Sequence, residues 1–395
     1  MKKSLNIAFV AAAFSISSIN ALDFNSVVEL AVAVNPEIAV STSQSIAELS
    51  LLQTENNLDN PEISFEGLFT PLGENKYNIE LSQSFDWPGV YAARRQQLNT
   101  AKLLADYNIQ IAKNDCRMQA AEAIITIIGS KLKIAELSDI LERYNVLKQT
   151  YIEAQQRGNI TKLDLNKLLI EIADLEASIA EENYSLNQAR STLAAICGGS
   201  ESVMNEAEHL TSLPEGQLLS VNDYITTAAA NSPKIAAAKA QTSLSGYEMK
   251  TIAKENLPGF TLGYRFARED GVNFNGFTFG MSIPSWGNRG KKAAAQASIN
   301  ASTLAERATE TSIEQQIIGI HNSASNLKSQ IDTYGSALIA TDNIALLDRA
   351  YKTGQITLTD YIQDTHYFHE AQNRLTDLRM RYANQIMQLA IISGL

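Results

Sequence analysis

The segment GNITKLD, residues 158–164, decides the fold of this chain because the chain repeats it. At residues 354–360 the sequence reads GQITLTD, so glycine, threonine and aspartate recur at the same spacing, 196 residues later. Residues 35–39 (NPEIA) and 232–236 (SPKIA) form a further pair at almost the same offset, as do Pro61 and Pro258. One architectural unit of nearly 200 residues therefore occurs twice.

The prolines mark where long helices are excluded. They lie at 36, 61, 71, 88, 214, 233, 258 and 284, which leaves residues 89–213 and 285–395 without one. Proline removes a helix donor and clashes with the preceding turn, so both stretches permit very long helices. Apolar residues there recur every seven positions, as in Leu165, Ile172, Ile179, Leu186 and Leu193. Each repeat is predicted to hold a helix of roughly 60 residues (about 92–156 and 288–352), a turn at the glycine and a returning helix of about 35.

The segments between the prolines have a different hydrophobic periodicity. In residues 76–86 and 274–284, apolar side chains alternate with polar or small ones, which is typical of strands with one apolar face. Residues 62–70 and 259–268 are the predicted hairpin partners. The four strands are rich in aromatic residues, as are the girdles of outer-membrane barrels, with soluble hairpins covering a helix as the alternative. We expect the following side chains to face lipid: Tyr77, Ile79, Leu81, Phe277, Phe279 and Met281.

The first 21 residues have the features of a secretory signal peptide. Lys2 and Lys3 precede the apolar run 7–16, and cleavage is predicted after Ala21. No other apolar run approaches about 18 residues, so we expect no transmembrane helix and assign membrane crossing to the strands. No cysteine lies near the predicted cleavage site, so no N-terminal lipid is expected. The chain has 43 acidic against 32 basic residues, which argues against nucleic acid as a partner.

The strands must be shared between subunits. Four strands cannot close a barrel, because about eight is the smallest number that does. Exposed strand edges are not tolerated in lipid. The predicted fold class is therefore mainly α with a small β part: duplicated coiled-coil hairpins form a trimeric α-barrel, and four strands per chain contribute to a shared transmembrane β-barrel of about 12 strands.

The predicted domain organisation follows the repeat. It comprises a signal peptide (1–21), a first repeat (22–199), a connector (200–220) in which glycine and proline interrupt the periodicity, and a second repeat (221–395).

With these features the chain resembles the TolC family of outer-membrane efflux channels. The resemblance covers essentially everything after the signal peptide and rests on the two repeats and the duplicated segments 158–164 and 354–360. The strand-to-helix segments 81–89 (LSQSFDWPG) and 282–289 (SIPSWGNR) resemble the heavy-metal branch, CzcC-like and CusC-like, more than TolC itself. The resemblance implies a homotrimer in the outer membrane of a Gram-negative bacterium, with a helical tunnel that crosses the periplasm to a membrane-fusion adaptor and an inner-membrane pump of the RND type.

The resemblance also implies roles for the two helical tips. It places Asp164, Asp360 and Tyr351 at the gate of the tunnel, and it places four residues at the contact with the adaptor: Gly158, Thr161, Gly354 and Thr357. The alternative is that both aspartates merely cap the returning helices. The second gate aspartate and the locking arginine of the family are replaced here by Gln363 and Ile356. A TolC-like closure network is therefore only partly present.

Catalytic chemistry finds little support. Residues 287–292 (GNRGKK) fail as a phosphate loop, because Ser285 stands where the first glycine belongs and no hydroxyl residue follows the lysine. His366 and His369 are weak candidates for a metal contact, with a solvated or packed pair as the alternative. Cys116 and Cys197 are predicted to be buried thiols, with a disulfide as the alternative.

These observations predict a function without catalysis. We expect no cofactor and no enzymatic activity, and interpret the chain as a passive export duct for small molecules or metal cations. The alternative is a pore-less coiled-coil structural protein of the periplasm or the cell surface.

Overall fold

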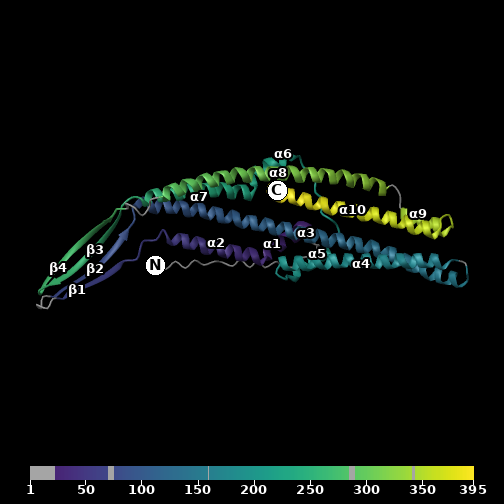
Figure 1. Ribbon diagram of the computed structural model, residues 1–395, viewed down its shortest axis with the longest axis horizontal. Helices are drawn as coiled ribbons and strands as arrows, with labels where there is room; N and C mark the ends of the chain where they lie inside the picture. Colours follow the sequence, from purple (N-terminus) through teal and green to yellow (C-terminus); the bar gives the residue numbers. More distant parts are fainter. Residues whose placement is uncertain (1–22, 70–74, 159, 284–289, 340–342) are drawn as a thin grey trace, which may run out of the picture.

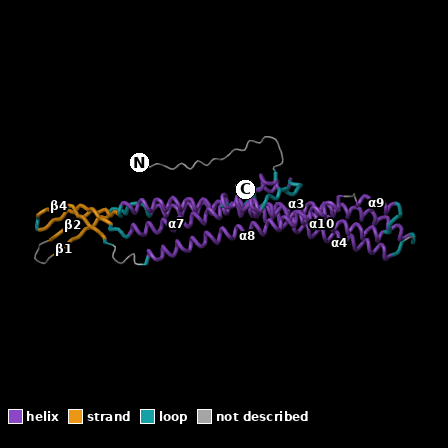
Figure 2. Tube along the Cα trace, turned by 90° about the horizontal axis from the view of Figure 1, so that it is seen from above, coloured by secondary structure: helices purple, strands orange, loops and turns teal. Residues whose placement is uncertain are grey.

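The computed structural model describes residues 23–395, apart from 70–74, 159, 284–289 and 340–342. The molecule is an elongated rod, with a sheet at one end and the turns between long helices at the other (Figures 1 and 2). The predicted signal peptide and most of the strand-to-helix segment 282–289 lie outside the described residues.

The first half of the chain forms two short helices, a hairpin and two long helices. These are α1 (Phe24–Val34), α2 (Pro36–Thr54), β1 (Glu62–Phe69), β2 (Asn75–Phe85), α3 (Pro88–Gln156) and α4 (Lys162–Ile196). The second half continues from α5 (Glu201–His209) with α6 (Val221–Asn231), α7 (Pro233–Glu255), β3 (Gly259–Glu269), β4 (Val272–Ser282), α8 (Lys291–Ile339), α9 (Asn343–Lys352) and α10 (Leu358–Ser393). The predicted class, mainly helical with a four-stranded sheet, is confirmed.

Local sequence explains where the helices begin and end. Pro36, Pro88 and Pro233 each occupy the first turn of a helix, where the missing donor costs no hydrogen bond. Without an internal proline, α3 runs for 69 residues. The expected single helix over about 288–352 is described as α8 and α9, and residues 340–342 between them lie outside the described part of the chain.

The sheet has the order β1-β2-β3-β4, and all neighbours are antiparallel. The pairing of β2 with β3 joins the two halves of the chain, because β2 comes from the first hairpin and β3 from the second. Strands β1 and β4 form the edges of the sheet within one protomer.

The helical part is held together by three apolar clusters along the rod. One contains α1, α3, α4 and α5; a second lies near the tips and joins α3 and α4 to α10; a third joins α6, α8 and α10. Cys116 and Cys197 are buried free thiols in the first cluster. Burial raises the pKa of the Cys116 thiol. No helix in the described ranges is both long enough and apolar enough to cross a membrane.

Candidate functional site

One face of the sheet is mainly apolar, with polar exceptions that include Gln83, Arg268, Asn273 and Asn275. Successive side chains point to opposite faces of a strand, and the register aligns Leu81 with Tyr264 and Tyr264 with Phe277. All six predicted lipid-facing residues therefore share one face: Tyr77, Ile79 and Leu81 from β2, and Phe277, Phe279 and Met281 from β4. These side chains are exposed in the protomer, and Phe277 retains 91% of its accessible surface. An exposed apolar area of this extent requires a cover other than water.

The opposite face carries most of the polar side chains of the sheet. Three of its contacts are direct cross-strand partners on β2 and β3, at intervals of four residues: Lys76 with Glu269 (3.1 Å), Glu80 with Arg265 (2.6 Å) and Ser84 with Thr261 (3.1 Å). Cross-strand pairs of this kind stabilise a sheet. The polar face thus joins the two halves of the chain along the β2–β3 seam.

An arginine ties the sheet to the helices. Arg94, on α3, donates to the Asp86 carboxylate (2.8 Å), the Glu255 carboxylate (2.9 Å) and the Glu55 carbonyl (2.9 Å). These acceptors lie at the ends of β2, α7 and α2. Sequence reasoning missed this residue, because two of its partners, Glu55 and Glu255, are distant in the chain and no local pattern marks the third.

The tip glycines have the backbone conformation that the sequence predicted. Gly158 and Gly354 have φ values of 75° and 73°, in the left-handed region that favours glycine. An added Cβ would meet no atom within 4 Å at either position. Glycine is therefore required for its conformation and not for close packing.

The tip threonines and aspartates cap the returning helices. Thr161 and Thr357 accept from the backbone N–H of Asp164 and Asp360, at 3.2 Å in both cases. Asp360 also accepts from the backbone N–H of Thr357 (3.1 Å), which completes a capping box. Hydrogen bonds from Thr357 lower the pKa of Asp360. The capping role, which was the alternative to a gate role, is therefore observed within a single chain.

Tyr351 connects the two tips. Its hydroxyl lies 2.6 Å from that of Tyr151, and its ring centre lies 5.0 Å from that of Tyr361. Tyr361 in turn donates to Asp348 (2.7 Å), which also accepts from Arg143. Burial raises the pKa of Tyr151 and of Tyr361. Sequence reasoning singled out Tyr351 but not these partners.

The two histidines do not converge on one point. His366 Nδ1 lies 3.5 Å from Glu171 on α4, whereas His369 Nδ1 lies 3.1 Å from Glu136 on α3. His369 Nε2 faces Asn373 at 2.8 Å. Within the described ranges, no group of three or more His, Cys, Asp or Glu side chains is arranged to hold a metal ion. This geometry favours a packing role for His369, whose side chain is 9% exposed, and a solvated one for His366, whose side chain is 57% exposed.

A buried lysine joins three long helices. Lys133 on α3 lies 2.7 Å from Asp377 on α10 and 3.1 Å from Glu182 on α4. Burial alone would lower the pKa of this amine, but the two carboxylates outweigh it, and the pKa is raised. The sequence offers no local signal for this arrangement.

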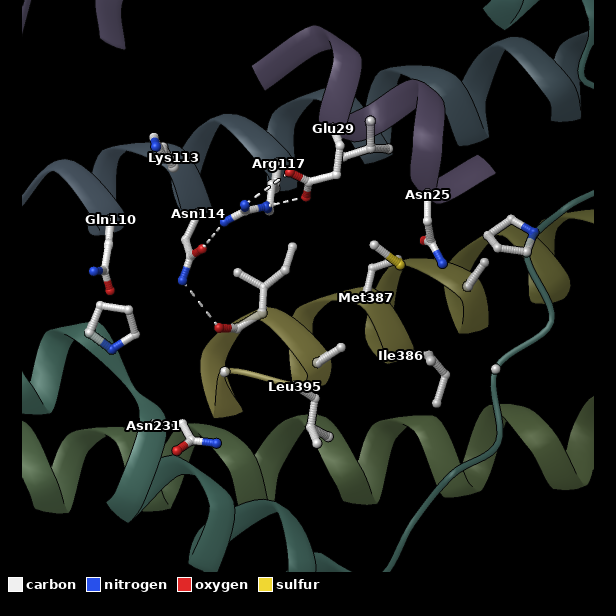
Figure 3. A pocket seen from close by; sticks show the side chains of 18 of the residues that line it. Asn25, Glu29, Gln110, Lys113, Asn114, Arg117, Asn231, Ile386, Met387 and Leu395 are labelled. Atoms are coloured by element: carbon white, nitrogen blue, oxygen red, sulfur yellow. Dashed lines mark hydrogen bonds and ion pairs between the residues drawn. The ribbon is translucent and has the colours of Figure 1, made fainter. Parts of the chain in front are cut away.

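A cavity of about 700 Å³ lies where α1, α3, the residues around Pro214 and the end of α10 meet (Figure 3). Arg117 projects from α3 and donates to Glu29 (Nη2–Oε2 3.0 Å) and Asn114 (2.6 Å). The Asn114 amide reaches the Ile391 carbonyl at 3.5 Å. The predicted site residues of strands and tips do not line this cavity. The Arg117 guanidinium is hydrogen-bonded to Glu29 and Asn114, which themselves line the cavity.

Comparison with known proteins identifies similar chains. No family model matches this sequence. It is 24% identical over 231 residues to the cobalt-zinc-cadmium resistance protein CzcC of Cupriavidus metallidurans. The match covers 58% of this chain and 54% of CzcC, so this chain spans about half the length of that relative.

Solved structures match over nearly the whole chain. The CmeC outer membrane channel of Campylobacter jejuni has a TM-score of 0.72 at 14% identity, with 97% of this chain and 90% of CmeC covered. The outer membrane protein VceC of Vibrio cholerae has a TM-score of 0.73 at 15% identity, covering 94% and 96%. At such identities the likeness establishes the fold alone.

Proposed function

We propose that this chain, which has the fold of the TolC outer-membrane channels, is the passive outer-membrane duct of a tripartite efflux system. The sheet carries the proposal: one face is mainly apolar and exposed across all four strands, and the other is mainly polar. Lipid on one side and an aqueous lumen on the other are the surroundings that suit such a sheet.

The duct is a homotrimer in this proposal. Strands β1 and β4 leave open edges, and an open edge in lipid would carry unsatisfied backbone groups. Three protomers would pair their edges into a closed barrel of about 12 strands. The 69 residues of α3 reach about 100 Å, a length suited to a tunnel through the periplasm of a Gram-negative bacterium.

The name of one relative supports the proposed cargo. The name of CzcC describes resistance to cobalt, zinc and cadmium. We assign this chain to the same heavy-metal branch, with metal cations as cargo, small organic molecules as the alternative, and a membrane-fusion adaptor and an RND-type inner-membrane pump as partners. A pore-less coiled-coil protein would leave the apolar sheet face without a role.

Fractionation and conductance test the proposal together. We expect the protein in outer membranes, a detergent-extracted mass of three chains, and ion conductance when that species is added to a planar bilayer. A monomer in the soluble periplasmic fraction would favour the pore-less alternative.

The aspartates at the tips have a separate prediction. Six carboxylates, from Asp164 and Asp360 in three copies, would line the periplasmic aperture. Asparagine retains capping ability, so Asp360→Asn should leave thermal stability nearly unchanged while cation preference and block by divalent cations decrease. Ion selectivity in planar bilayers is the measurement. Unaltered selectivity in the Asp164→Asn, Asp360→Asn double variant would mean that these groups only cap helices.

The proposed adaptor contact is tested by cross-linking in cells. Cysteine at Thr161 or Thr357 should form cross-links to the adaptor, because the tips lie at the end of the rod opposite the sheet (Figure 1). Cysteine at residues 200–220 serves as the control, since this connector lies away from the tips. Cross-links confined to the connector would contradict the assignment.

A further inference from the structure

The polar face of the sheet contains an arginine that is held across three strands. Arg265 on β3 donates through Nε (3.0 Å) and Nη2 (2.6 Å) to one carboxylate oxygen of Glu80 on β2. The other oxygen of Glu80 accepts from the Thr278 hydroxyl on β4. One carboxylate oxygen of Glu80 therefore holds Arg265, and the other is held by Thr278.

A glycine makes room for this arrangement. A Cβ added to Gly263 would lie 2.5 Å from the Thr278 hydroxyl oxygen and 3.0 Å from the carboxylate of Glu80. Any larger residue at this position would displace the bond between Glu80 and Thr278. The register partner of Arg265 on β4 is Gly276, where an added Cβ would meet open space. Gly263 therefore leaves room for the bond between Glu80 and Thr278, and Gly276 leaves space beside the Arg265 guanidinium.

The two partners differ in exposure. The side chain of Glu80 is 17% exposed and that of Arg265 is 48% exposed. A guanidinium has five N–H donors, of which Glu80 engages two. The pair has no net charge. Because Arg265 is the more exposed partner, the pair presents mainly its positive group to the surroundings, with N–H donors that Glu80 does not engage.

We propose that Arg265 weakens the cation preference of the barrel. The inference rests on the proposed duct, in which the polar face lines the lumen. Three copies then place three guanidinium groups at one level of the barrel. Each guanidinium is paired with Glu80, and Glu62, Glu66 and Glu269 lie on the same face. The exposed guanidinium groups therefore weaken, without reversing, the cation preference that a chain with net charge −11 imposes. Permeants that carry an anionic group meet donors there, whereas cations, the proposed cargo, still pass a face on which carboxylates outnumber cationic groups.

Reversal potentials of the wild-type trimer in a planar bilayer with a KCl gradient test the inference. Near 0.1 M salt, where the Debye length is about 10 Å, Arg265→Gln should raise the K⁺/Cl⁻ permeability ratio about threefold or more. Near 1 M salt, with a Debye length of about 3 Å, the difference should largely vanish. Arg265→Lys restores the charge and should keep the ratio close to that of the wild type.

The matched control is Arg268→Gln. Arg268 lies on the same strand but on the opposite face, in register with Tyr77. The Arg268→Gln substitution should leave the K⁺/Cl⁻ permeability ratio unchanged. An equal shift in both variants would show that overall charge matters and would overturn the role of Arg265, as would an unchanged ratio in Arg265→Gln trimers that conduct normally.

Failure of the duct itself gives a different result. A wild-type trimer without conductance refutes the proposed function before any variant is compared. In conducting Arg265→Cys trimers, a charged thiol reagent should reduce the current, because position 265 lines the lumen. Conductance that such a reagent leaves unchanged would place Arg265 outside the permeation path while leaving the duct intact.

Discussion

Replacing Ile79 by arginine is expected to lower the free energy of unfolding in lipid by about 2–4 kcal/mol, if the residue lies near the bilayer midplane. Ile79 occupies the apolar face between Phe65 and Phe266, its register partners on β1 and β3. A guanidinium there would have to leave water for hydrocarbon. Phe279→Arg, on β4, should have a similar effect. Denaturant titration of the protein folded into vesicles gives the free energy.

The control for this prediction is Ser82→Arg on the same strand. Ser82 points to the polar face, opposite Gly263, and an arginine there should cost little. Glu80 is less suitable, although it shares that face, because an arginine at this position would stand beside Arg265 and lose the bond to Thr278. Equal losses at Ile79 and Ser82 would contradict the assignment of the two faces.

Replacing Lys133 by methionine is expected to destabilise the helical part by about 2–3 kcal/mol. Loss of one partner from a fully buried ion pair costs roughly 3–5 kcal/mol, because the remaining charge stays buried and unpaired. The lysine side chain is 14% exposed and Glu182 is 22% exposed, but Asp377 is 43% exposed, so water offsets part of the cost. Chemical unfolding of the trimer, followed by the helical circular dichroism signal, measures the loss.

An exposed ion pair provides the comparison. Arg157, which caps the end of α3, lies 3.1 Å from Glu153, and the side chains are 70% and 66% exposed, so Arg157→Met should change stability only slightly. Adding Glu182→Gln to Lys133→Met should recover part of the loss, since it removes a carboxylate left without its cation. Similar losses in Lys133→Met and Arg157→Met would refute the role of the buried amine.

The features that could be predicted from the sequence are those that depend on neighbours in the chain. Alternation along residues 76–86 predicted that Tyr77, Ile79 and Leu81 share a face, because a strand places every second side chain on the same side. The spacing of Thr357 and Asp360 likewise allowed a capping box, because these positions meet within one helical turn. The stretches without proline permitted the long helices for the same local reason.

What only the tertiary structure decided is which distant residues meet. Glu80 bonds to Arg265, 185 positions away, and Tyr151 to Tyr351, 200 positions away. Lys133 likewise finds Glu182 and Asp377 on two other helices. Periodicity indicates which side of a helix or strand is apolar, but it does not set the axial alignment of one element against another. That alignment depends on the packing of the whole rod, and it determines which charges are paired and which remain exposed.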